Sequence, residues 1–131
     1  MSAYKKFDEI QFRDLVLLKK ALEDLGFAVL EEGETLPLYG YQGDMRPERA
    51  QLVIRREHLT SASNDLGFVR TDKGYVAVVS EYDERVLLDG KLMSKLRTAY
   101  SLRVVEHVTQ RLHGTAARTT EGSVIKIKVR Y

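Results

Sequence analysis

Residues 65–82 read DLGFVRTDKGYVAVVSEY, and this stretch decides the fold. Two runs rich in β-branched and aromatic residues, 67–70 and 75–79, flank a short turn sequence, and such residues favour strands. Gly74 can adopt the positive φ that closes a short loop, and Asp72 can hydrogen-bond its own turn. The stretch therefore predicts a β-hairpin at the centre of an antiparallel sheet.

The composition is that of a globular protein. The chain has 131 residues, 44% hydrophobic and 31% charged, which suits a single domain over residues 1–131 and excludes a largely disordered chain. There is no cysteine, so disulfides, thiolate nucleophiles and sulfur-ligated zinc are excluded. No signal peptide is recognisable, and no apolar run approaches the roughly 20 residues that span a membrane. We expect a cytoplasmic protein, or a stromal one if a plastid encodes it, with no membrane partner.

Apolar periodicity predicts two helices. The first has Asp14 as its N-cap and ends at Gly26, and leucines at steps of three and four residues form its apolar stripe: Leu15, Leu18, Leu22 and Leu25. The second covers residues 87–113, where apolar residues recur every four positions. That spacing drifts around a helix of 3.6 residues per turn, so we expect a bend near Tyr100 or burial on two sides, and a stop at Gly114.

The remaining strands are predicted from alternation and turn residues. They are 4–12, 27–30 closed by an acidic turn at 31–34, an edge strand at 36–42 containing Pro37, 50–56 after a loop at 43–47, and 123–131. Together the elements predict an α+β fold. We expect a mainly antiparallel sheet of about five to seven strands with two helices packed on one face.

No cluster of catalytic or metal-binding type stands out. His107 and His113 are not at the spacing of metal ligands on a helix, and no serine lies in a G-x-S-x-G elbow. The glycines of 40–43 lack the Lys-Ser/Thr of a phosphate loop, and the acidic run 81–84 suits a solvated turn. We therefore predict no catalytic, metal-binding or cofactor-binding residue and no cofactor. An enzyme whose site the sequence hides is the least favoured alternative.

Four residues are candidates for binding a protein partner. Tyr39 and Tyr41 would share one face of a regular strand, Arg46 would lie in the next loop, and Arg70 would stand beside the hairpin turn. Tyrosine and arginine are enriched at protein interfaces. The competing interpretation is that the tyrosines cover the edge of the core.

A basic stripe supports an alternative function, nucleic-acid binding. Lys126, Lys128 and Arg130 alternate along the last predicted strand, and Arg55 would join them on the sheet face. Such a face could follow a phosphate backbone, although alternating charge also keeps an edge strand from pairing. The net charge of only +2 favours the interpretation that these charges keep the edge strand from pairing.

Several segments together resemble the hypothetical chloroplast open reading frame thirty-five family of cyanobacteria and plastids, a family of unknown function. They are LKKALEDLGF at 18–27, YGYQG at 39–43, AQLVI at 50–54, DLGFVR at 65–70 and Gly74-Tyr75. Residues 82–90 depart from the pattern. The resemblance implies a small α+β protein and transfers no catalytic residue. Its genomic neighbourhood implies an accessory or adaptor-like role beside an AAA-type ATPase, so our lead hypothesis is a non-enzymatic protein that binds another protein.

Overall fold

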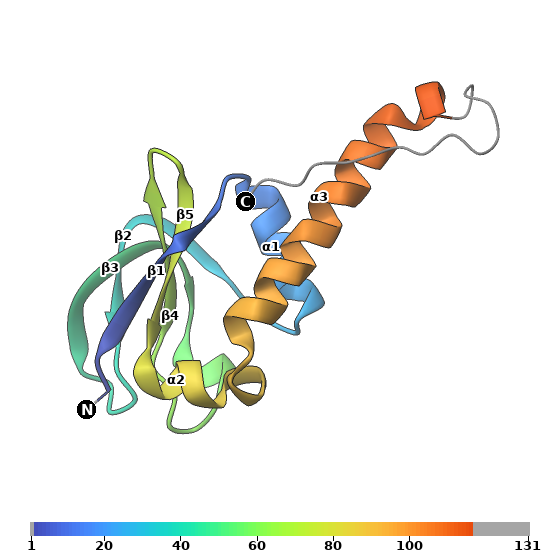
Figure 1. Ribbon diagram of the computed structural model, residues 1–131. Helices are drawn as coiled ribbons and strands as arrows, with labels where there is room; N and C mark the ends of the chain where they lie inside the picture. The colour runs from blue at the N-terminus through green and yellow to red at the C-terminus, as the bar shows by residue number, and fades with distance from the viewer. Residues whose placement is uncertain (1, 117–131) are drawn as a thin grey trace.

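The computed structural model describes residues 2–116 (Figure 1). Within that range the strands are β1 (Tyr4–Phe12), β2 (Glu31–Tyr39), β3 (Met45–Ile54), β4 (Leu66–Thr71) and β5 (Gly74–Ser80). The α-helices are α1 (Leu15–Asp24), α2 (Glu81–Val86) and α3 (Leu92–Ala116), with short 3₁₀ helices η1 (Arg56–His58) and η2 (Leu87–Gly90). The predicted α+β class is confirmed, with three α-helices over residues 2–116 instead of two.

The β4–β5 hairpin lies at the centre of the sheet, as predicted. The strand order is β1-β5-β4-β3-β2, and every neighbouring pair is antiparallel. Thr71 pairs with Gly74 at the turn, where Gly74 has a φ of +139°. A Cβ on Gly74 would also lie 2.9 Å from the carbonyl oxygen of Phe12, so the turn packs directly on the end of β1.

Helices α1 and α3 pack on one face of this sheet and close the main core. Asp14 caps α1, accepting a hydrogen bond from the amide of Leu17 at 3.1 Å, and Gly26 follows the helix with a φ of +97°. Phe12 lies edge-on to Tyr100 of α3 and Phe68 of β4, with ring centroids 5.0 and 6.3 Å apart. Because these rings come from β1, β4 and α3, one cluster joins the sheet to the helix layer.

The opposite face of the sheet is covered by its own β2–β3 hairpin. A second apolar cluster there joins residues of β2, β3 and β5, namely Leu38, Ala50, Val53 and Val78, with Tyr4 of β1 packed against it. Gly67 of β4 lies beneath this cluster, and a Cβ on it would be 2.9 Å from that of Ala50. The β2–β3 hairpin therefore bends across the sheet (Figure 1). A side chain at Gly67 would fit only if its neighbours moved.

Two local predictions around β2 and β3 were wrong. Residues 27–30 are not a strand: Phe27 is buried but Ala28 and Val29 are both exposed, and the strand begins instead at the acidic run from Glu31. Glu31 is held in the strand by an ion pair with Arg55, which the local sequence cannot reveal. The predicted loop 43–47 is already part of β3 from Met45 onward, whereas the edge position of the Pro37 strand is confirmed.

The helical predictions after β5 also needed correction. Residues 81–84 form the start of α2 and not a solvated turn, because Ser80 caps that helix and Asp83 is fully buried. Leu88 and Asp89 adopt left-handed φ values of 51° and 57°, so α3 begins only at Leu92, and it continues past Gly114 to Ala116.

The predicted strand 123–131 lies outside the described residues. Over residues 2–116, no helix has the length and apolar character needed to cross a bilayer.

Candidate functional site

A buried carboxylate, Asp65, organises the end of the sheet where β2 turns into β3. Its side chain is only 1% exposed. One oxygen, Oδ2, accepts hydrogen bonds from the amide of Tyr39 and from Arg55 Nη1, both at 2.8 Å, and Oδ1 accepts from the amide of Arg56 at 2.7 Å. The Tyr4 hydroxyl donates to the Asp65 carbonyl at 2.6 Å. One aspartate thus joins β1, β2, the end of β3 and the start of β4.

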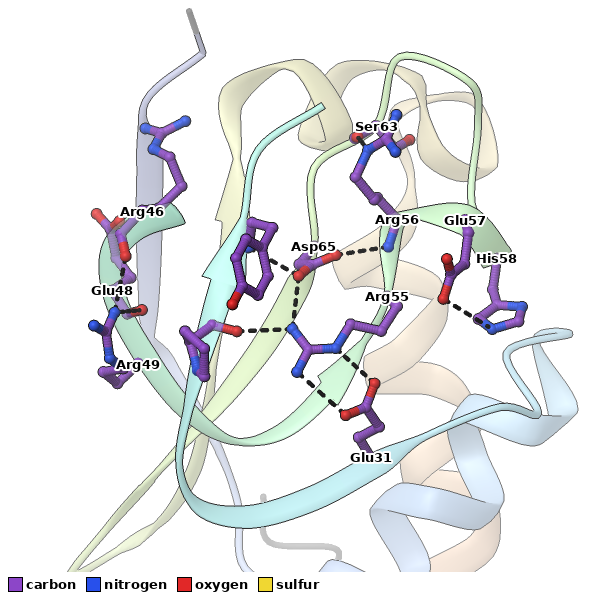
Figure 2. A network of polar contacts seen from close by, with 12 residues as sticks. Glu31, Arg46, Glu48, Arg49, Arg55, Arg56, Glu57, His58, Ser63 and Asp65 are labelled. Carbon is purple, nitrogen blue, oxygen red and sulfur yellow. Dashed lines mark hydrogen bonds and ion pairs between the residues drawn. The ribbon is translucent and has the colours of Figure 1, made fainter. Parts of the chain in front are cut away.

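Arg55 connects this carboxylate to the edge strand. Its Nε donates to Glu31 Oε2 at 2.6 Å and its Nη1 to the Pro37 carbonyl at 2.7 Å (Figure 2). The hydrogen bond with Glu31 and, after it, the one with Asp65 raise the pKa of Arg55, and the Arg55 bond lowers the pKa of Glu31. Both oxygens of Asp65 accept hydrogen bonds, two of them from backbone amides, so this carboxylate holds the backbone in place.

A second buried carboxylate, Asp83, lies beside the first. Its Oδ2 accepts from the amide of Asn64 at 2.9 Å and from the Ser80 hydroxyl at 2.7 Å, while the amide of Asp83 donates to Ser80 Oγ at 3.1 Å. Ser80 and Asp83 therefore form a reciprocal cap on α2. Asn64 Oδ1 in turn accepts from the amide of Tyr41 at 3.0 Å. The β2–β3 turn is thus tied to α2 through Asn64.

Between this turn and α2 lies a hollow of about 440 Å³, which we call the tyrosine hollow. Its lining residues are Ser2, Tyr41, Ala62, Asn64, Glu81, Tyr82 and Arg85. Tyr41 is 39% exposed, and the guanidinium of Arg85 makes no ion pair or hydrogen bond with any residue from 2 to 116. The amide of Tyr82 donates to the Ser2 hydroxyl at 2.7 Å. This bond ties the segment before β1 to the start of α2, and both line the hollow.

The structure separates the four predicted partner-binding residues. Tyr39 ends β2, with its ring 5.7 Å from the Arg55 guanidinium carbon, and Tyr41 is in the following turn, so the two do not share a strand face. Arg46 lies in β3 over the ring of Tyr4 at 5.1 Å. Arg70 is at the other end of β4 from the Asp65 network. Tyr41 alone of the four lines the tyrosine hollow.

Arg70 lines a different cavity, which we call the hairpin-tip hollow. It measures about 490 Å³ and is formed by Arg13, Arg70, Thr71, Asp72, Lys73, Gly74 and Tyr75. The Arg70 guanidinium pairs with Glu34 of β2 at 3.0 Å, an ion pair whose two side chains are both largely exposed. This hollow and the tyrosine hollow are separate sites.

Of the residues predicted for nucleic-acid binding, Arg55 alone lies within the described range. It is 16% exposed and neutralised by two carboxylates, so it does not present a free charge on the sheet face. Lys126, Lys128 and Arg130 lie outside residues 2–116. Residues 2–116 contain no group of three or more histidine, aspartate or glutamate side chains placed to hold a metal ion.

Sequence reasoning missed Tyr82 and Arg85. One signal could have found them: the spacing Ser80-x-x-Asp83 is that of a helix N-terminus, and a helix starting there brings positions 82 and 85 onto one face. The buried Asn64 and Asp65 gave no such signal, because a polar stretch before a strand is typical of an exposed loop.

Comparison with known proteins gives a family and little else. The family model described as "Protein of unknown function (DUF1257)" matches residues 21–126. The match contains β2 to β5 and every residue of the tyrosine hollow except Ser2. Neither the comparison with curated proteins nor that with solved structures gives a match.

Proposed function

This chain belongs to DUF1257, a family of proteins of unknown function, and we propose that it binds another protein, without catalysis, through the tyrosine hollow. The observation that carries the proposal is the lining of that hollow. Two tyrosines, and an arginine that forms no ion pair or hydrogen bond with residues 2–116, stand on backbone that a buried hydrogen-bond network fixes. Tyrosine and arginine dominate the binding energy of protein interfaces, especially where they line a pocket.

Rigidity of the hollow supports the same proposal. The Tyr41 backbone is held by Asn64, and Asn64 is held by Asp83, which lies in the helix that carries Tyr82 and Arg85. A surface fixed before binding loses less conformational entropy when a partner arrives, so more of the contact energy appears as affinity. Buried polar groups are costly unless satisfied, and here most of them are satisfied by the elements that shape the hollow.

The finer parts of the proposal come from the resemblance to the chloroplast open reading frame thirty-five family. On that basis the protein is an adaptor-like accessory protein of the cytoplasm or plastid stroma, and its partner is an AAA-type ATPase. Glu81 and Arg85 line the hollow, so such a partner can form one ion pair with a negative side chain and one with a positive side chain.

Affinity purification from native cells tests the proposal. The tagged protein is compared with Tyr41→Ala/Arg85→Ala, at low and at high salt. We expect a protein retained by the parent chain and lost from the double variant, because that variant removes an aromatic and a cationic anchor without touching a hydrogen bond of the network.

The matched control is Lys20→Ala/Lys95→Ala, which truncates two long side chains outside the tyrosine hollow. It should retain the partner. If no protein is retained by the parent chain under any salt condition, the interaction hypothesis is wrong. If the partner stays with Tyr41→Ala/Arg85→Ala, the protein binds elsewhere.

A further inference from the structure

The hairpin-tip hollow differs from four other hollows of the described surface in the charge of its lining. Its lining contains three cationic residues, Arg13, Arg70 and Lys73, and one carboxylate, Asp72. Cationic and anionic side chains are equal in number in the tyrosine hollow and in the hollows beside α1 and along β1. The hollow beside α3 has one charged residue, Lys95. The hairpin tip therefore offers the most positive cavity of the five.

Its cations are available to a ligand. Arg13 and Lys73 make no ion pair with any residue in the described part of the chain. Arg70 pairs with Glu34, whose side chain is 83% exposed. An exposed ion pair of this kind contributes only about 0–1 kcal/mol, so a ligand anion can replace Glu34 at little cost.

The backbone of the turn brings these cations together. Gly74 packs on the end of β1, and a Cβ there would be 3.1 Å from the Cα of Arg13. The Thr71 hydroxyl donates to the Gly74 carbonyl at 2.7 Å and accepts from the amide of Lys73 at 3.2 Å. The turn is thus fixed against β1, with Lys73 and Arg13 lining the same cavity.

We propose that the hairpin-tip hollow binds the phosphate groups of a nucleotide. Guanidinium groups match phosphate oxygens in a bidentate geometry, and the lysine ammonium adds a compact positive charge. Tyr75, which packs partly against the main core, also lines the hollow and supplies aromatic surface beside the cations for contact with a base. The volume of about 490 Å³ lies within the usual range of small-ligand pockets. A free nucleotide and a single strand share this chemistry.

Two probes distinguish a free nucleotide from a single nucleic-acid strand. Binding of a fluorescent oligothymidylate is followed by anisotropy, and binding of ATP by calorimetry, each at about 50 and about 200 mM salt. Affinity should fall as salt rises, because ligand phosphates release counterions. Tight binding of the oligonucleotide with weak binding of ATP assigns the site to a strand; the reverse assigns it to a free nucleotide. No binding of either probe at the lower salt overturns the proposal.

Two variants with opposite expected effects locate the site. Arg13→Glu/Lys73→Glu should lower affinity about tenfold or more, which is about 1.4 kcal/mol. Asp72→Asn, which removes the single anion of the lining, should raise it about two- to threefold by the same electrostatic argument, a gain that unfolding cannot produce.

The control Lys20→Glu/Lys95→Glu makes the same change in net charge at positions that do not line this hollow. It should leave affinity within about twofold, because salt screens exposed charges outside the binding site. Equal loss in the control and in Arg13→Glu/Lys73→Glu would show that only net charge matters and would refute the site. The proposal does not depend on the tyrosine hollow.

Discussion

Gly67→Ala adds one methyl group at a crowded point of the sheet, beneath the β2–β3 hairpin. The new Cβ would lie 2.9 Å from the Cβ of Ala50 and 3.1 Å from both δ-carbons of Leu38. Apolar carbons are in favourable contact at about 3.5–4.0 Å, so the β2–β3 hairpin must move away from β4 by several tenths of an ångström. Because the backbone of Ala50 lies in a ladder and cannot rotate aside, we expect a net loss of stability.

The size of the loss follows from two opposing effects. Overpacking a filled core costs about 1–3 kcal/mol. Replacing glycine by alanine in a strain-free backbone gains about 0.4–1 kcal/mol, because the unfolded chain loses freedom. The clash is the larger effect here, so the free energy of unfolding should fall by about 1–2 kcal/mol. The chain has no tryptophan, so urea unfolding is best followed by far-UV circular dichroism.

A double-mutant cycle tests whether the contact with Ala50 causes the loss of stability, and not only whether stability falls. Ala50→Gly removes the methyl group that the new Cβ meets at the shortest distance. In that background Gly67→Ala should cost about 1 kcal/mol less than in the parent chain, since residues in contact are coupled. An equal cost in both backgrounds, or stabilisation by Gly67→Ala alone, would refute the close packing of the hairpin on β4.

Four further substitutions address the polar network. Asp65→Asn should cost about 2–4 kcal/mol in urea unfolding, because it leaves buried donors without a charged acceptor; Glu31→Gln, at a side chain 48% exposed, should cost less than about 1 kcal/mol, and equal costs would contradict the burial argument. Burial first, and the Asp65 carboxylate second, raise the pKa of Tyr4 above its ordinary 10.0, so its contribution is complete below about pH 10 and is lost as pH rises further. Tyr4→Phe should therefore show a smaller fall in Tm between neutral and alkaline pH than the parent chain, and an identical fall would show that Tyr4 is not responsible. Ser80→Ala should cost about 1–2 kcal/mol in thermal unfolding by removing the α2 cap, and an unchanged Tm would contradict that role.

The parts of the fold that could be predicted are those that local chemistry specifies. Gly74 in its turn, Asp14 as a cap and the leucine stripe of α1 each act within a few residues, and each was predicted correctly. The start of β2 could not be predicted in this way. Local sequence makes Glu31 a turn residue, and only folding brings Arg55, which follows β3, into an ion pair with it.

The candidate site shows the same limit more strongly. Tyr41 was predicted from its place beside Tyr39 on an expected strand and from the enrichment of tyrosine at interfaces. Its neighbours in the hollow come from α2, from the segment before β4 and from the start of the chain. Asp65 and Asp83 are hydrophilic residues in polar stretches, and only their tertiary partners make burial tolerable. A single sequence therefore points to one residue of the hollow and leaves its framework unseen.

The strand order also determines when the sheet can be completed during synthesis. β1 leaves the ribosome first, but its hydrogen-bonded neighbour in the described sheet, β5, is the last of the five strands to appear. Until then β1 has no ladder partner, and the bond from the Tyr4 hydroxyl to Asp65 must likewise wait. Such non-local closure slows folding. We expect the β2–β5 meander to form first as a nascent unit, and the docking of β1 to be the step that commits the chain to its native state.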